Sequence, residues 1–212
     1  MSDKLLEIQN QVRDGYAKEN PTCKKHQILF VGSSLMQFFP ITELQQDLDL
    51  PLTIYNRGVL GTETGDMLDH MDLLVFDLQP DYIYINIGTN DIAHGWSEDE
   101  IMGRYDKILS MIQTKLPDTK ITMMAYYPVN EAKQVGRKHP RSNATIDHYN
   151  DLAKALAKKH QVYFINVNDG LSDETGNLKA EYTEDGIHMI PDAYKIVLAN
   201  MLPYLRKDCG LV

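Results

Sequence analysis

Two short segments, far apart in this sequence, carry side chains with the types and spacing of a nucleophile, a base and an acid. "GSSL" at 32–35 places two serines directly after the apolar run "ILFV", and "DGIH" places Asp185 three residues before His188. A turn of that length can set the carboxylate against one ring nitrogen while the other points at a hydroxyl. Ser34, His188 and Asp185 are therefore candidates, although residue types alone do not distinguish Ser34 from Ser33.

Both segments also have an ordinary structural explanation. Serine accepts hydrogen bonds from the free N–H groups at a helix N-terminus, so Gly-Ser-Ser could simply cap a helix. Asp followed by Gly is typical of a plain turn, and with seven histidines in the chain one can fall near an Asp by chance.

Two further segments could supply the hydrogen-bond donors that a reaction of such a nucleophile with an acyl group requires. Attack on an acyl carbon makes the carbonyl oxygen negative, and that oxygen needs donors aimed at it. "NRGVLG" at 56–61 offers the unobstructed N–H of Gly61, "GTND" at 88–91 offers the side-chain amide of Asn90, and the N–H of Ser34 is a third donor. The same residue types are common in ordinary turns.

The hydrophobic pattern predicts how these segments are brought together. Dense apolar runs of the kind found in strands buried on both faces alternate with helical patterns, and an amphipathic helix is expected over 1–20. The strands are expected at 26–31, 51–56, 81–88, 120–127 and 161–166, and the helices at 62–78, 97–116, 143–160 and 191–206. This alternation predicts a three-layer α/β/α sandwich with a five-stranded parallel sheet, and ligands bind at the carboxyl ends of such strands.

Composition narrows the classes of partner. A formal net charge of −9 disfavours nucleic-acid binding, and no apolar stretch is long enough to span a membrane, so we expect a cytoplasmic protein with a small-molecule partner. Cys23 and Cys209 lie at opposite ends of the chain, which excludes a disulfide framework and a thiolate zinc site. We expect one domain over 1–212, and a homodimer remains open.

Taken in order, the four segments resemble those of the SGNH, or GDSL, hydrolase family, and are most similar to its platelet-activating-factor acetylhydrolase-like branch. The resemblance covers about residues 26–206. It implies a flavodoxin-like fold and a serine esterase with Ser34 as nucleophile and with Asp185 and His188 as acid and base. It also implies oxyanion donors at Ser34, Gly61 and Asn90, and it implies no metal or organic cofactor.

One position departs from the family pattern, and one loop stands out in charge. Ser33 occupies a place where the family usually has Asp, so the loop before the nucleophile lacks a carboxylate.

The segment 133–141 gathers five basic or imidazole side chains in an acidic protein. Arg137 and Lys138 could attract an anionic part of the substrate, whereas a solvated loop or subunit contact is the alternative.

The substrate class is less determined than the chemistry. Helices and strands account for most of the chain, which leaves little for a large apolar lid and favours small acyl groups, acetyl above all. A lysophospholipase or thioesterase activity is an alternative, and so is a binding module that has lost turnover. A nucleotide-binding fold is disfavoured because no glycine-rich phosphate loop follows the first strand.

Overall fold

The five apolar segments pair into one parallel sheet in the computed structural model, which describes residues 3–211. The strands lie in the order β2-β1-β3-β4-β5, the order of flavodoxin-like folds. Their bounds are β1 (Ile28–Gly32), β2 (Ile54–Gly58), β3 (Tyr82–Asn86), β4 (Lys120–Met124) and β5 (Tyr163–Ile165). The prediction of a five-stranded parallel sheet is confirmed.

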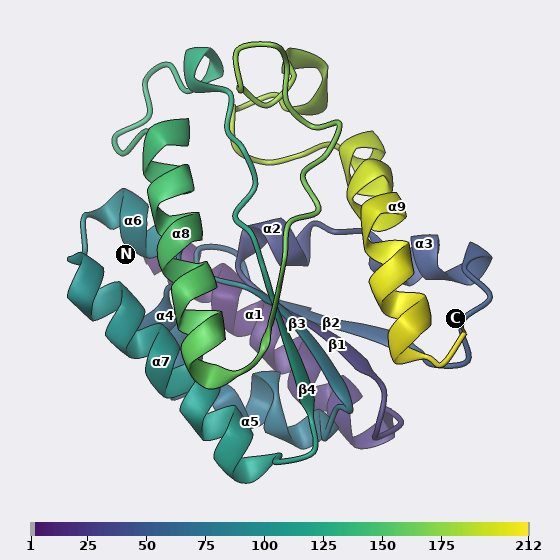
Figure 1. Ribbon diagram of the computed structural model, residues 1–212. Coiled ribbons are helices and arrows are strands. Elements are labelled where there is room, and N and C mark those ends of the chain that lie inside the picture. The colour runs from purple at the N-terminus through teal and green to yellow at the C-terminus, as the bar shows by residue number, and fades with distance from the viewer. Residues whose placement is uncertain (1–2, 212) are drawn as a thin grey trace.

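Helices cover both faces of this sheet, with α7 and α8 on one side and α9 on the other (Figure 1). The helices are α1 (Asp3–Glu19), α2 (Ser34–Gln37), α3 (Ile41–Leu44), α4 (Thr64–Asp69), α5 (Met71–Leu74), α6 (Thr89–His94), α7 (Glu98–Lys115), α8 (Asn143–His160) and α9 (Pro191–Asp208). Short 3₁₀ turns are η1 (Asn20–Thr22), η2 (Gln45–Asp47), η3 (Phe76–Leu78), η4 (Glu131–Lys133) and η5 (Ala180–Tyr182). Among residues 3–211, no helix is both long and apolar enough to cross a bilayer.

Each strand contributes to two separate cores because successive side chains point to opposite faces of the sheet. Leu29 and Val31 of β1 pack with the buried side chains of α7 and α8. Ile28 and Phe30, which alternate with these two residues along β1, point to the other face and pack with α9. This explains why β1 is apolar along its whole length rather than alternating between apolar and polar residues.

The single helix predicted over 62–78 is wrong, because the chain breaks at His70 into α4 and α5. The ring nitrogen Nδ1 of His70 bonds the carbonyl oxygen of Asp66 at 2.8 Å, the acceptor that its own N–H would use in a continuous helix. That N–H instead bonds Met67 O at 3.1 Å. A local side-chain bond therefore competes with the helical one, which hydrophobic spacing does not reveal.

Two glycines allow α2 to lie directly on the ends of β1 and β2. Gly32 is in register with Gly58 on one side and with Asn86 on the other. A Cβ on Gly32 would lie 2.0 Å from Asn86 O, and one on Gly58 would lie 2.2 Å from the backbone nitrogen of Gln37. Only glycine fits these close approaches, so the start of α2 is held at the sheet edge by sterics.

Replacement of Gly32 by alanine should destabilise the protein, whereas the same change at Gly103 on α7 should not. The added methyl at Gly32 collides with rigid backbone, while nothing lies within 4 Å of a Cβ at Gly103. We expect Gly32→Ala to lower the free energy of unfolding by about 2–3 kcal/mol. Gly103→Ala should raise it by about 0.5–1 kcal/mol. Urea denaturation of both variants measures the difference, and equal values would contradict the steric argument.

Candidate active site

Ser34 begins α2, immediately beyond the carboxyl end of β1, and its hydroxyl contacts His188. The Oγ atom lies 2.9 Å from Nε2 of His188, although 154 residues separate the two in the chain. Ser34 is 7% exposed, so its hydroxyl opens to solvent over a narrow area. The sheet therefore brings together the two sequence segments that were expected to meet.

The ring of His188 is fixed on its other side by Asp185. Nδ1 of His188 lies 2.7 Å from Oδ2 of Asp185, and Oδ1 of the same carboxylate accepts from the backbone N–H groups of Ile187 and His188. A Cβ on Gly186, where φ is +84°, would lie 2.5 Å from Asn130 O, so the turn requires glycine there. The "DGIH" segment is thus a tight turn folded around its own carboxylate.

Asp185 is held as a carboxylate by these contacts. Burial alone would raise its pKa, but the backbone N–H groups of His188 and Ile187, together with the imidazole, outweigh burial and lower the pKa to about 2. Arg137 also donates to Asp185, to its carboxylate through Nη2 and to its carbonyl oxygen through Nε at 3.3 Å. The acid is therefore negative over the whole neutral range.

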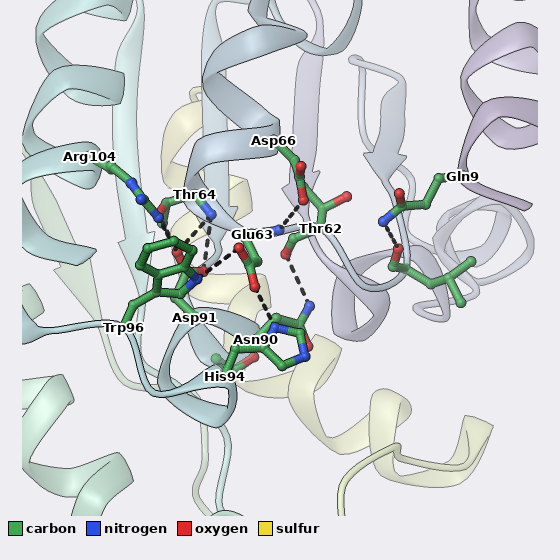
Figure 2. Close-up of polar contacts among 12 residues, drawn as sticks. Gln9, Thr62, Glu63, Thr64, Asp66, Asn90, Asp91, His94, Trp96 and Arg104 are labelled. Atoms are coloured by element: carbon green, nitrogen blue, oxygen red, sulfur yellow. Dashed lines mark hydrogen bonds and ion pairs between the residues drawn. The ribbon is translucent and has the colours of Figure 1, made fainter. Parts of the chain in front are cut away.

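The expected donors lie at the ends of the neighbouring strands. The N–H groups of Ser34 and Gly61 have no acceptor among residues 3–211. Gly61 has φ of +69°, a left-handed conformation that suits glycine. The amide nitrogen of Asn90 donates to Thr62 O at 3.0 Å (Figure 2), and its second N–H has no partner within residues 3–211. Each of the three expected donors therefore keeps an N–H that no acceptor within residues 3–211 occupies.

Asp91, the neighbour of Asn90, ties the start of α6 to the start of α4. Its fully buried carboxylate accepts from the backbone N–H of Thr64 at 3.0 and 3.1 Å and from the Thr64 hydroxyl (Figure 2). Burial raises the pKa of Asp91 despite these bonds. The segments that carry Asn90 and Gly61 are thereby joined behind the candidate site.

Helix α1 supports the Gly61 segment from outside. Gln9 donates from Nε2 to Leu60 O at 2.9 Å, and the hydroxyl of Tyr16 donates to Gly58 O at 2.7 Å. The expected N-terminal helix therefore packs against the loop that presents Gly61; residues 1 and 2 of that prediction lie outside the described part.

The basic segment 133–141 borders the site, as its place after β4 predicts, but its arginines bond protein groups. Arg137 contacts Asp185, whereas Arg141 donates to Thr89 O at 3.0 Å and to Oδ1 of Asn90 at 2.9 Å. Lys138 makes no hydrogen bond or ion pair with residues 3–211. The positive charges of Arg137 and Arg141 therefore face Asp185 and the Asn90 amide, respectively.

Ser33 makes no side-chain contribution to the loop before Ser34. Its hydroxyl is buried and has no hydrogen-bond partner within residues 3–211, and it does not cap α2. The side chain of Asn56 instead holds α2, donating to Met36 O at 2.6 Å and to Phe39 O at 3.3 Å.

Sequence reasoning did not assign roles to Phe38, Asp91 or Arg141. The ring of Phe38 meets that of His188 nearly edge-on, with centroids 5.3 Å apart, and Phe38 is 43% exposed. Its position four residues after Ser34 was a usable signal, because that spacing repeats on one helix face. Within residues 3–211, no group of three or more His, Cys, Asp or Glu side chains could hold a metal.

Known proteins resemble this chain in sequence and in fold. Residues 39–196 match the GDSL-like Lipase/Acylhydrolase family, a range that begins after Ser34. Platelet-activating factor acetylhydrolase IB subunit alpha2 of Gallus gallus is 27% identical over 172 residues, which is 81% of this chain and 72% of that protein. The alpha1 subunit of Bos taurus is 22% identical over 193 residues, or 88% of this chain and 80% of that protein.

Solved structures also resemble this chain. A Streptococcus pneumonia protein named for platelet activating factor has a TM-score of 0.87 and 32% identity, with 96% of this chain and 95% of that chain covered. Axe2, an acetylxylan esterase from Geobacillus stearothermophilus, has a TM-score of 0.68 at 17% identity, covering 86% and 95% of the two chains, and shares the fold. The predicted family is confirmed: this chain belongs to the GDSL-like lipase/acylhydrolase family.

Proposed function

We propose that this protein is a serine esterase that hydrolyses small acyl esters through Ser34, His188 and Asp185. One observation carries the proposal: the Ser34 hydroxyl, the imidazole and the carboxylate form an unbroken line of contacts of 2.9 and 2.7 Å. Family membership supports hydrolysis, and the contacts among the three side chains fit the arrangement that this chemistry requires.

The reaction divides into two acyl transfers. Nε2 of His188 takes the Ser34 proton while Oγ attacks the ester carbonyl carbon, and the electron pair of the C=O bond moves to oxygen. The N–H groups of Ser34 and Gly61 and the Asn90 amide would donate to that oxygen. When the C=O bond reforms, the alcohol leaves with the proton from His188. Water then repeats the sequence and releases the acid.

Several observations favour a small acyl group. The relatives named acetylhydrolase and acetylxylan esterase both take their names from acetyl. The ring of Phe38, which is partly exposed beside His188, offers apolar surface of a size that suits a short acyl chain. A lysophospholipase or thioesterase activity remains the alternative, and so does a binding module without turnover. A cytoplasmic location, a single domain and a homodimer stay predictions.

Ser34→Ala and Ser33→Ala form a matched pair that tests the nucleophile. We expect Ser34→Ala, like His188→Ala, to lower kcat by on the order of 1000-fold or more, with Asp185→Ala milder, because nucleophile and base act as one unit. Ser33→Ala should keep activity, since its hydroxyl has no partner. Hydrolysis of p-nitrophenyl acetate measures all four variants.

Labelling by a fluorophosphonate probe provides the control for a site without turnover. Wild type should take one label, and Ser34→Ala should take none. Loss of labelling with Ser33→Ala but not with Ser34→Ala would move the nucleophile by one residue, and an unlabelled wild type would favour the binding module.

A series of p-nitrophenyl esters tests the acyl-size prediction. We expect kcat/KM to be highest for acetyl and to fall as the acyl chain lengthens, because helices and strands account for most of residues 3–211 and leave little chain for an apolar lid over Ser34. A preference for long chains would instead support a lysophospholipase-type activity.

The same series, extended to esters that carry an anion, tests the roles of Arg137 and Lys138. If they attract an anionic substrate, an Arg137→Ala, Lys138→Ala double variant should lose more kcat/KM on charged than on neutral esters. Equal losses would indicate that Arg137 acts through its contact with Asp185.

Asp185 should contribute to stability above pH 4 and not near pH 2. Its pKa is about 2 when folded and about 3.9 in an unfolded chain, so ionisation favours the folded state. That contribution is complete above the unfolded value and is lost as the pH falls through the folded one. Melting temperatures of wild type and Asp185→Asn should differ by a constant amount from pH 5 to 7 and converge below pH 4. A gap that widens in acid would contradict this assignment.

A further inference from the structure

Arg141 lies at the end of the loop between η4 and α8, and its planar side chain donates hydrogen bonds to the start of α6. Nε donates to Thr89 O at 3.0 Å, and Nη2 donates to Oδ1 of Asn90 at 2.9 Å. The guanidinium therefore spans two consecutive residues of the segment that supplies the donor amide. Arginine suits this task because its donors are held in one rigid plane.

This contact determines which way the Asn90 amide points. Its oxygen accepts from Arg141, and its nitrogen donates to Thr62 O at 3.0 Å. Turning the amide round would bring its NH₂ against the guanidinium N–H groups and its oxygen against the Thr62 carbonyl, so both contacts would become repulsive. The remaining N–H is thereby kept available as a donor, and a cation on the amide oxygen strengthens that donor by polarisation.

The backbone of Arg141 is itself fixed by a buried glutamine. Gln134 accepts from the N–H of Arg141 at 2.7 Å and donates to its carbonyl oxygen at 2.8 Å. Gln134 is 4% exposed and packs against Gly186, next to Asp185. Burial and the nearby charge of Arg137 lower the pKa of Arg141 to about 10, which still leaves it positive at neutral pH.

We propose that Arg141 is a positioning residue of the oxyanion site, which locks the Asn90 amide with its remaining N–H toward the substrate. The inference rests on the proposed esterase function and adds to it a residue that touches neither substrate nor nucleophile. Its effect passes through Asn90, so it disappears when the amide is absent. A purely structural tie between the loop and α6 would act regardless of the side chain at 90.

A double-mutant cycle on Arg141 and Asn90 separates these two roles. We expect Arg141→Met to lower kcat on p-nitrophenyl acetate by about 10- to 100-fold with KM nearly unchanged, since a donor is lost mainly in the transition state. In an Asn90→Ala background the same change should cost less than about threefold. Lys154→Met, which removes an exposed positive charge on α8, is the control and should match wild type.

Several kinetic outcomes overturn the inference. Equal fold-losses of kcat with and without Asn90, or an effect on KM alone, would show that Arg141 does not act through the amide. An active wild type with an unimpaired Arg141→Met would sink this inference alone, whereas a wild type without esterase activity would remove the proposed function and the inference with it.

A second readout does not depend on activity. The side-chain amide signals of Asn90, identified by their loss in Asn90→Ala, should exchange slowly with solvent in wild type and quickly in Arg141→Met. If that variant does not fold, Arg141→Lys, which keeps the charge without the planar fork, should show intermediate exchange. Exchange that is unchanged in a folded variant would contradict the lock.

Discussion

The parallel pairing of β1 with β2 and β3 is the constraint on which the candidate site depends. Gly32 is in register with Gly58 of β2 and with Asn86 of β3, so these three strands end at the same edge of the sheet. Ser34, Gly61 and Asn90 follow within a few residues of those ends. The loops after β4 and β5 rise beside them, as Figure 1 shows. A one-residue slip in either pairing would separate the hydroxyl from the donors.

Order at the site comes from contacts behind it rather than from the residues that would meet substrate. Asp91 ties α6 to α4, Gln9 of α1 holds the loop before Gly61, and Asn56 of β2 holds α2. The side chain of Ser33, where the family usually has a carboxylate, forms no hydrogen bond with the described residues. The steric fit of glycines and an amide on the neighbouring strand therefore account for the placement of α2 without that carboxylate.

The loop between β4 and α8 concentrates positive charge where the rest of the protein is acidic, and it uses that charge internally. Arg137 faces the carboxylate of Asp185, and Arg141 faces the amide of Asn90. One loop therefore reaches both halves of the proposed mechanism, the side that activates the nucleophile and the side that receives the oxyanion. A change in this loop would affect both together, even though none of its residues belongs to the triad.

Local patterns in the sequence, namely burial on both faces and helical periodicity, predict the parallel sheet, the long helices and the place of the four segments at the strand ends, whereas the order of the strands comes from the fold. Only the tertiary structure decided that His70 breaks a helix and that Arg137 and Arg141 bond Asp185 and Asn90. These outcomes depend on which groups come within hydrogen-bond reach after packing. From sequence alone, a basic loop is expected to be solvated surface, and only the folded structure shows which acceptors its side chains contact.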